Sequence, residues 1–326
     1  MLRVLSLFDG MSCGQIALDR AGIPIEIYYA SEIDTNSITV TNRNYPNTIQ
    51  IGDVIQLSEN HLKNLGKIDL LIGGSPCQNL SITVINNSQH NQGLEGKKSR
   101  LFYEFVRVLR VISPKYFLFE NVGSMKKRDK QIITKVLGVD SMMINSNIVS
   151  AQDRKRYYWT NIPIDKLPKD KGLVLKDIMQ EASEVNQKYW YDDKEFEFHG
   201  WDKKIIATLD INGHDILKRV GNPQFKSHTL TACRGGNIQK KVYQIFDKEI
   251  GGMCRKLTPT EYERLQTVPE GYTEGVADSH RYNMLGDGWT VDVIVHIFSH
   301  IPLDVNTKED GFPPTPKGMG IQPTIL

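Results

Sequence analysis

The sequence has no long hydrophobic run and no dense cysteine pattern. No apolar stretch approaches the roughly 20 residues that a membrane helix needs, and the amino-terminus reaches Asp9 too soon to hold a signal-peptide core. The 326 residues contain four cysteines, far apart and without a CxxC pair. This spacing argues against a disulfide framework and a zinc site. We therefore expect a cytoplasmic protein with reduced thiols, no membrane contact and no bound metal.

Neither sign of charge dominates the composition. The chain has 40 Lys and Arg against 38 Asp and Glu, which gives a net charge of +2. A nucleic-acid-binding protein could carry this charge if its cations cluster locally, and a metabolic enzyme could carry it equally well. Length and composition indicate a globular protein with two domains, or with one large domain that contains an insertion.

Strand-like and helix-like patterns alternate over the first 160 residues. The apolar runs that predict buried strands are Val4–Phe8, Ile25–Ala30, Ile68–Ile72 and Tyr116–Phe119, with a short strand assumed near Ile49–Ile51. Between them, "CGQIALDRAGI" and "LFYEFVRVLRVI" place apolar residues at helical spacing. This alternation predicts an α/β fold, with a mostly parallel, doubly wound sheet and helices on both faces.

The pattern changes after Pro163, where the chain becomes more polar and short strand candidates such as Lys240–Phe246 appear. The sequence predicts an α/β domain over residues 1–180 and an inserted, smaller, β-rich domain over residues 181–275. Residues 276–326 return to the first domain, with a loosely ordered tail after residue 302.

Side chains that could take part in binding or catalysis follow each predicted strand. In a doubly wound sheet, ligands bind at the carboxyl ends of the strands. The residues in those places are the loop Phe8–Gly14, Glu32, Asp53, Cys77 and Glu120. We therefore expect all five features at one edge of the sheet.

The first three features fit a nucleoside ligand. Gly10 and Gly14 allow a sharp turn before a helix, but their G-x-x-x-G spacing is not the G-x-G-x-x-G of dinucleotide sites. Glu32 suits the two hydroxyls of a ribose, and Asp53 could accept a hydrogen bond from an adenine amino group. S-adenosylmethionine is such a ligand. Each feature alone is also consistent with a tight turn or a solvated loop residue.

The remaining features fit covalent chemistry. Gly-Gly-Ser-Pro places Cys77 in a loop at a strand end, where a thiolate near cations would be reactive. The cations could come from Arg154 and Arg156, which alternate with Gln152 as on one face of a strand. Glu120 closes the apolar run "YFLFE", and a carboxyl group among apolar walls keeps its proton more readily than one in water. An exposed polar strand face and a helix-capping glutamate are the alternative interpretations.

Taken in order, these motifs resemble those of the DNA (cytosine-5) methyltransferases of prokaryotic and phage type. The matching segments, which are spread over nearly the whole length of the chain, are "LSLFDGMSCG", "GGSPCQNLS", "RLFYEFVRVL", "FENV", "QDRKRYY", "RKLTPTEYERLQTVPEGY" and "YNMLGDGWTVDVI". The resemblance implies a Rossmann-like S-adenosylmethionine-dependent sheet and an inserted target-recognition domain. One departure is Asp287, where the closing motif usually has asparagine.

The resemblance also implies a mechanism. The thiolate of Cys77 attacks carbon 6 of a cytosine that has been flipped out of duplex DNA, and carbon 5 then takes the methyl group. Glu120 hydrogen-bonds or protonates ring nitrogen 3, while Arg154 and Arg156 supply positive charge. A mobile loop over residues 79–99 closes over the base.

The family's remaining site residues transfer to this sequence as follows. The implied cofactor residues are Phe8, Asp9, Gly10, Met11, Cys13, Gly14, Glu32, Ile33, Asp53, Val54 and Trp289. The implied DNA contacts are Ser81, Thr229 and Arg234. Arg234, beside two glycines, could pair with guanine or contact a phosphate, and Trp289 could equally be a core residue.

The resemblance implies double-stranded DNA as partner and a monomer in the cytoplasm of a prokaryote or a phage-infected cell. A restriction endonuclease could share the recognition site without binding the protein, or the enzyme could be solitary. The alternatives are an RNA cytosine-5 methyltransferase, whose branch carries a Cys-Phe-Thr segment absent here, and a non-catalytic DNA-binding relative. A nicotinamide-dependent oxidoreductase is opposed by the missing third glycine.

Overall fold

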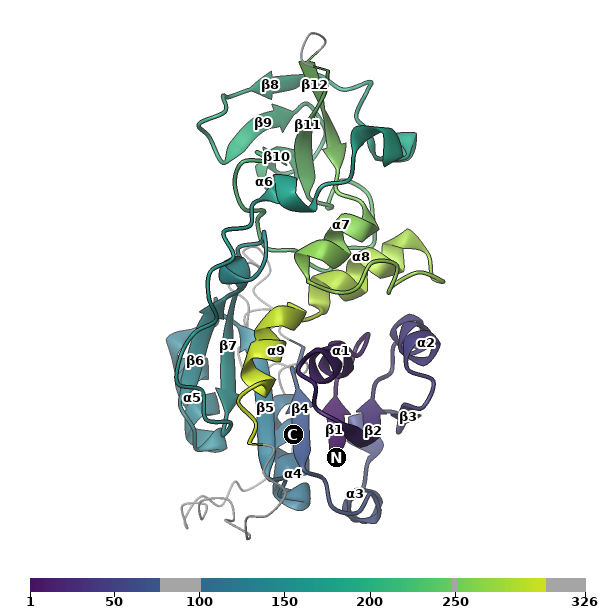
Figure 1. The fold of residues 1–326 in the computed structure, drawn as a ribbon, viewed down its shortest axis with the longest axis vertical. Helices are drawn as coiled ribbons and strands as arrows, with labels where there is room; N and C mark the ends of the chain where they lie inside the picture. Colours follow the sequence, from purple (N-terminus) through teal and green to yellow (C-terminus); the bar gives the residue numbers. More distant parts are fainter. Residues whose placement is uncertain (77–100, 248–250, 303–326) are drawn as a thin grey trace, which may run out of the picture.

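The computed structural model describes residues 1–76, 101–247 and 251–302, and these form two separate sheets (Figure 1). The larger sheet has seven strands in the order β3-β2-β1-β4-β5-β7-β6. Its strands are β1 (Leu2–Leu7), β2 (Ile25–Ser31), β3 (Ile49–Gln50), β4 (Leu70–Gly73), β5 (Tyr116–Val122), β6 (Ser141–Asn145) and β7 (Lys155–Thr160). The predicted α/β class is confirmed, and the five apolar runs correspond to β1–β5.

The first five strands are parallel to one another, and β7 runs antiparallel to both of its neighbours, β5 and β6. Every residue of β4 and β5 is buried, as expected for a parallel sheet covered on both faces. The segment that begins at Gln152 was expected to be a strand, but β7 begins only at Lys155.

Successive residues of the strands pack on opposite faces of this sheet. Leu118 faces the core that contains α1 (Cys13–Arg20) and α9 (Val291–Phe298). Phe117 and Phe119 face the core that contains α4 (Leu101–Ile112) and α5 (Lys127–Leu137). The remaining helices of the larger domain are α2 (Thr35–Asn44) and α3 (Glu59–Asn64). Helices therefore cover both faces, as the alternating pattern predicts.

The second sheet lies within the range predicted for the inserted domain. It has five strands in the order β12-β11-β10-β9-β8 and its own small core. The strands are β8 (Phe196–Phe198), β9 (Ile205–Leu209), β10 (Arg219–Gly221), β11 (Lys241–Asp247) and β12 (Gly251–Lys256), and a short helix α6 (Asp215–Lys218) precedes β10. The chain then forms α7 (Pro259–Leu265) and α8 (Asp278–Asp287), which lie between the two sheets in Figure 1.

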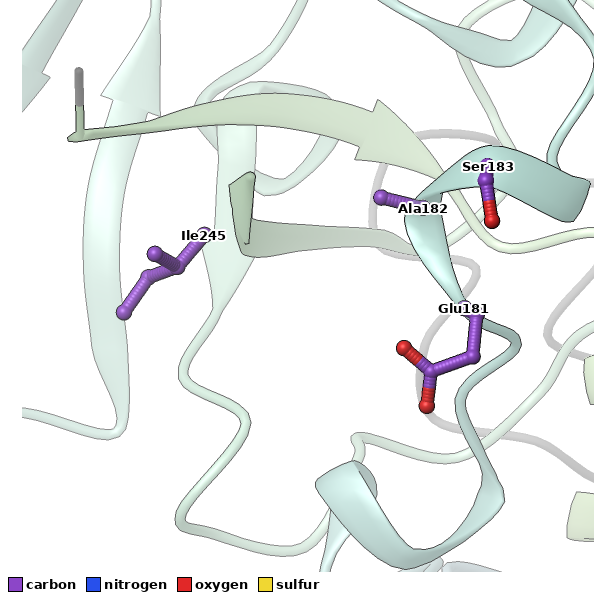
Figure 2. Close-up of a pocket in the computed structure, with 4 residues that line it drawn as sticks. All are labelled: Glu181, Ala182, Ser183 and Ile245. Atoms are coloured by element: carbon purple, nitrogen blue, oxygen red, sulfur yellow. The ribbon is translucent and has the colours of Figure 1, made fainter. Parts of the chain in front are cut away.

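A pocket lies in the second sheet, away from the carboxyl edge of the larger one. It has a volume of about 340 Å³, lies beside β11 and is lined by Glu181, Ala182, Ser183 and Ile245 (Figure 2). Glu181 is the ionisable side chain of that lining, so this pocket does not hold the residues predicted to bind the cofactor or to act in catalysis.

Across the described parts of the chain, no helix combines the length and apolarity that a bilayer crossing requires.

A buried ion pair joins β12 to α7. Both Arg255 and Glu261 are fully buried, and the guanidinium donates to both carboxylate oxygens at 2.5 and 2.7 Å. The same carboxylate accepts the main-chain N–H of Thr258 at 2.8 Å and of Gln180 at 2.9 Å. This one carboxylate therefore holds together the start of α7, the end of the second sheet and the segment that leads into it.

Replacing Glu261 with glutamine should destabilise the protein strongly, because it leaves the Arg255 charge buried without compensation. We expect the free energy of unfolding to fall by about 3–5 kcal/mol, measured by urea titration. Glu270→Gln is the matched control, since Glu270 pairs with Arg264 at the exposed surface and should cost less than about 1 kcal/mol. Equal losses in the two variants would contradict the assignment.

Candidate active site at the carboxyl edge of the sheet

The register of the sheet brings four predicted features to one edge. Leu7 lies opposite both Ser31 and Gly73, and Gly73 lies opposite Phe119, so these residues form one row across β2, β1, β4 and β5. The residues that follow this row are Phe8, Glu32, Gly74 and Glu120. The expected meeting of the strand ends is therefore present in the structure.

The Glu32 carboxylate is fixed by main-chain amides. Its Oε2 accepts the N–H of Gly10 at 2.7 Å, and its Oε1 accepts those of Ile33 and Asp34 at 2.7 and 2.8 Å. Gly10 has a φ of 57°, in the left-handed region, and no atom lies within 4 Å of the position of a Cβ there. The side chain of Ile33 is 71% exposed. A rigid carboxylate thus sits beside an open turn and an exposed apolar side chain.

Asp9 is held by two hydroxyl groups. Tyr28 donates to Oδ1 at 2.8 Å and Ser12 donates to Oδ2 at 2.6 Å. Burial raises the pKa of Asp9 to about 6, although the hydrogen bonds from Ser12 and Tyr28 oppose this shift. Asp9 therefore organises the turn itself.

Asp53 and Val54 point in different directions. Asp53 caps the short 3₁₀ helix Val54–Gln56, with Oδ1 accepting the N–H of Ile55 at 3.0 Å. The side chain of Val54 is 3% exposed and packs in the hydrophobic core. The structure keeps Asp53 near the edge and does not bring the Val54 side chain there.

Three residues of the first loop and helix face inward. Met11 and Cys13 are 1% and 4% exposed, and burial raises the pKa of the Cys13 thiol to about 12. The Cys13 thiol lies 3.8 Å from the main-chain oxygen of Trp289. A Cβ on Gly14 would lie 2.3 Å from Ile72, so this glycine lets α1 approach the sheet. These inward-facing residues pack the first loop and α1 against the sheet.

A second cluster forms around Glu120, which is 8% exposed. Arg156 approaches Oε1 with its Nε at 2.9 Å, and the Trp289 indole N–H donates to Oε2 at 3.1 Å. Gly74 leaves space for this carboxylate, because a Cβ there would lie 2.9 Å from Oε2. The sequence "YFLFE" predicted apolar surroundings for Glu120, but its carboxylate oxygens contact an arginine and an indole N–H.

Asn121 links this cluster to the cysteine loop. Its side-chain amide donates to the main-chain oxygen and the hydroxyl of Ser75, at 3.2 and 3.3 Å. Ser75 comes two residues before Cys77 in the sequence. Cys77, Ser81 and the loop 79–99 lie outside the described residues. The sequence interpretation missed Asn121, although the "ENV" motif places it directly after Glu120.

The Arg154 side chain binds main-chain oxygen atoms. Its buried guanidinium donates to the main-chain oxygens of Leu230 at 2.9 Å, Gly286 at 3.1 Å and Gly288 at 2.9 Å. Gln152 is also fully buried, and its side-chain oxygen accepts the N–H of Leu230 at 2.7 Å. The alternative interpretation of Gln152 and Arg154 as part of an exposed polar strand face is therefore wrong, since both side chains are buried.

The two described candidates for DNA contact differ in their surroundings. The Thr229 hydroxyl donates to the main-chain oxygen of Asp153 at 2.5 Å, which docks the segment against the larger domain. Arg234 is exposed and precedes Gly235 and Gly236, whose φ angles are 117° and 74°. Arg234 is exposed, and Thr229 holds the segment between β10 and β11 against Asp153.

Residues 2–302 match the sequence family described as C-5 cytosine-specific DNA methylase. The chain belongs to this family. The chain is 31% identical over 232 residues to the orphan methyltransferase M.SPRI of Bacillus phage SPR, covering 67% of this chain and 50% of that protein. It is 25% identical over 330 residues to the type II methyltransferase M.HhaI of Haemophilus parahaemolyticus, covering 94% and 96%.

The alignment with the phage methyltransferase M.SPRI spans half the length of that relative. Among solved structures, the fold of this DNA methylase family member is similar to that of the Entamoeba histolytica methyltransferase EhMeth. The TM-score is 0.68 at 15% identity, over 92% of this chain and 97% of that chain. The Schizosaccharomyces pombe Dnmt2 methyltransferase gives a TM-score of 0.64 at 18% identity, over 91% and 97%.

The elevated pKa of Asp9 makes stability depend on pH. The folded state binds the proton more tightly than the unfolded state, whose value is near 3.8. The contribution of the protonated Asp9 carboxyl group to the free energy of unfolding is therefore complete below about pH 3.8 and is lost as the pH rises through about 6. Asp9→Asn mimics the protonated form, so above pH 6 it should be more stable than the unmodified protein by about 1–2 kcal/mol.

This pH dependence is measured by urea unfolding of both proteins between pH 4 and 8. Asp140→Asn, at an exposed carboxyl group, is the control and should show a small difference at every pH. A constant difference between Asp9→Asn and the unmodified protein over this range would show that the carboxyl group titrates normally.

Proposed function

We propose that this protein transfers a methyl group from S-adenosylmethionine to carbon 5 of a cytosine flipped out of a short, specific duplex DNA sequence. The observation that carries this proposal is the position of Glu120, whose carboxylate is held by Arg156 and Trp289. Glu120 directly follows Phe119, which pairs with Gly73, the last residue of the strand that precedes Cys77 in the sequence. Membership of the C-5 cytosine-specific DNA methylase family supports the same reaction.

The residues around the first three strand ends fit a nucleoside cofactor. Glu32 is oriented by three amides, and its oxygens retain capacity to accept hydrogen bonds from two ribose hydroxyls. The exposed side chain of Ile33 offers an apolar surface to a purine, and Asp53 follows at the next strand end. When bound, S-adenosylmethionine supplies the methyl group that the reaction transfers.

The covalent step is assigned to Cys77. Its thiolate forms a bond to carbon 6, the electrons of the 5,6 double bond shift to form a double bond between carbons 4 and 5 while ring nitrogen 3 takes up a proton, and carbon 5 of this enamine takes the methyl group. A base then removes the proton from carbon 5, and the carbon–sulfur bond breaks to restore the thiolate and the ring. Glu120 holds ring nitrogen 3 and favours the addition by hydrogen bonding or proton donation.

The two arginines have different roles in this proposal. Arg156 lies against Glu120 and brings positive charge to the reacting ring. Arg154, whose guanidinium donates to three main-chain oxygens, acts as a positioning residue between the domains. The catalytic role that the resemblance implies for Arg154 stays a prediction beside this positioning role.

The second sheet is proposed to be the target-recognition domain, within residues 181–275, and residues 1–180 and 276–326 form the catalytic domain. Arg234 is exposed on a loop with two left-handed glycines, so its side chain can reach a base edge or a phosphate. Thr229 serves this domain by docking it onto Asp153. The proposed substrate is double-stranded DNA, bound by a monomer.

Replacing Cys77 with serine should abolish methylation, because a serine hydroxyl is a far weaker nucleophile than a thiolate. We expect at least about a thousandfold loss of kcat. The measurement incubates protein with S-adenosylmethionine and unmethylated duplexes of varied sequence, then maps 5-methylcytosine at base resolution. Cys254→Ala, in the core of the second sheet, is the control. Methylation by Cys77→Ser would refute the covalent step.

Trp289→Phe tests how Glu120 is oriented. The substitution keeps an aromatic ring but removes the N–H that donates to Oε2. Loss of one such hydrogen bond is worth about 1–1.5 kcal/mol, so kcat should fall about tenfold while KM for DNA changes little. Trp201→Phe, in the second domain, is the matched control. An unchanged kcat with a raised KM for the cofactor would instead assign Trp289 to cofactor binding.

A further inference from the structure

Two consecutive lysines lie on opposite faces of the second sheet at the start of β11. The ammonium group of Lys241 donates to the main-chain oxygens of Asn237 and Gln239, at 2.7 and 3.1 Å. Lys240 lies one residue earlier, so its side chain is on the other face. There it makes no ion pair or hydrogen bond with any residue that the structure describes. Local contacts therefore account for the charge of Lys241 and not for that of Lys240.

The main chain holds Lys240 between the second sheet and α7. Its N–H donates to the hydroxyl of Tyr262 in α7 at 2.8 Å, and its oxygen accepts the N–H of Leu257 at 2.9 Å. The side chain is half-buried, and burial together with the charge of Arg219 lowers the pKa of Lys240. A lysine whose pKa is lowered by folding costs stability at neutral pH, because the folded state disfavours its charge. The stability of the fold therefore does not explain a lysine at this position.

Arg219 lies beside Lys240 and adds a second positive charge. In the parallel pairing of β10 with β11, Val220 lies opposite Lys241, so the residues just before them are level with each other. Arg219 is exposed, and its guanidinium has no ion pair or hydrogen bond within residues 1–76, 101–247 and 251–302. Figure 1 shows β10 at the end of the second sheet that is nearest the larger domain. Two cations without a paired carboxylate in the described structure therefore lie side by side.

His228, in the segment between β10 and β11, lies close to these two cations. Its ring is half-buried, and Nε2 is buried with no hydrogen-bond partner among the described residues. Burial lowers the pKa of His228 and the charges of Lys204, Lys240 and Arg219 lower it further, whereas Asp153 raises it. The Asp153 carboxylate is already paired with Lys204. The β10 basic cluster, defined as Arg219, His228 and Lys240, therefore has an excess of positive charge.

This cluster lies on the side of the second domain that meets the edge with Glu120. Thr229, directly after His228, donates to the main-chain oxygen of Asp153, and Asp153 comes three residues before Arg156. Arg156 contacts Glu120, and three extended residues span about 10 Å. A DNA strand whose cytosine reaches Glu120 therefore passes within a few nucleotides of the cluster.

We infer that the β10 basic cluster binds a backbone phosphate of the duplex DNA close to the target cytosine. A phosphate group carries a negative charge and oxygens that accept hydrogen bonds from a guanidinium and an ammonium group at the same time. Guanine also accepts hydrogen bonds from arginine, but it is neutral and would leave the adjoining charge of Lys240 uncompensated. This inference rests on the proposed function and adds a DNA contact to those that the sequence motifs imply.

The test compares Arg219→Gln/Lys240→Gln with Lys194→Gln/Lys256→Gln by measuring the Kd for duplex DNA over a range of salt concentrations. The control removes the same charge from other parts of the second domain, since Lys256 pairs with Lys241 on the opposite face and Lys194 precedes β8. Each phosphate contact contributes about 0.9 to the slope of log K against log salt. The cluster variant should lower that slope by about 1–2 and weaken binding about 10–60-fold near 0.1 M salt. The loss should be equal for cognate and non-cognate duplexes, because phosphate contacts carry no sequence information.

Thermal stability provides a second readout. Lys240→Gln should raise Tm slightly, since it removes a half-buried charge that the folded state disfavours. Arg219→Gln alone, at an exposed side chain, should lower the salt slope by about 1 with little change in Tm. Weaker DNA binding by a protein that is no less stable separates a binding role from a structural one.

His228 provides a third readout, because it reports whether the bound anion lies next to the cluster. A phosphate there opposes the charges of Lys204, Lys240 and Arg219, so non-cognate duplex DNA should raise the pKa of His228. The measurement is an NMR titration of the histidine rings with and without DNA, with His228→Gln to assign the signal. DNA should shift this pKa much less in Arg219→Gln/Lys240→Gln.

Three results would each overturn the inference while leaving the proposed function intact. They are equal salt slopes for the two double variants, a loss confined to the cognate duplex, and a pKa of His228 that DNA does not change. A slope change seen with single-stranded RNA of equal length, but not with duplex DNA, would also overturn it. Failure of the unmodified protein to bind or methylate any duplex would instead refute the proposed function.

Discussion

The buried guanidinium of Arg154 is the interaction on which the geometry of the candidate site depends. It donates to Leu230, in the segment between β10 and β11, and to Gly286 and Gly288, in the segment that leads to Trp289. Trp289 in turn donates to Glu120. A buried charge that loses such partners costs several kcal/mol, so the position of the segment between β10 and β11 and the orientation of the Glu120 carboxylate are linked through one side chain.

Close packing reinforces this link. A Cβ on Gly286 would lie 2.3 Å from the main chain of Thr231 and Ala232, so the segment that leads to Arg234 passes directly over this glycine. Gln266 adds hydrogen bonds to the main-chain oxygens of Leu285 and Gly288, at 2.6 and 3.1 Å. The loop that is proposed to read DNA and the loop that orients Glu120 are therefore packed on the same short stretch of chain.

Much of the larger domain could be predicted from the sequence because its signals are local. The apolar runs located the five parallel strands, and "LFYEFVRVLRVI" matches α4 from its first residue to its last. Strand β6 lacked such a run and was not predicted, and the strand expected from Gln152 begins only at Lys155, as β7. The buried contacts of Arg154 could not be predicted, because its partners are main-chain oxygens 76 to 134 residues away. Any residue can supply such an oxygen, so no residue type marks those positions.

The sequence by itself determined which side chains gather at the carboxyl edge of the sheet, because the ends of parallel strands must meet there. It also determined the order of the motifs that mark the family. Only the tertiary structure decided what each side chain touches. It paired Glu120 with Arg156 and Trp289, turned Met11 and Cys13 inward, and used Thr229 for docking. These outcomes depend on distances between segments far apart in the chain, which local patterns do not encode.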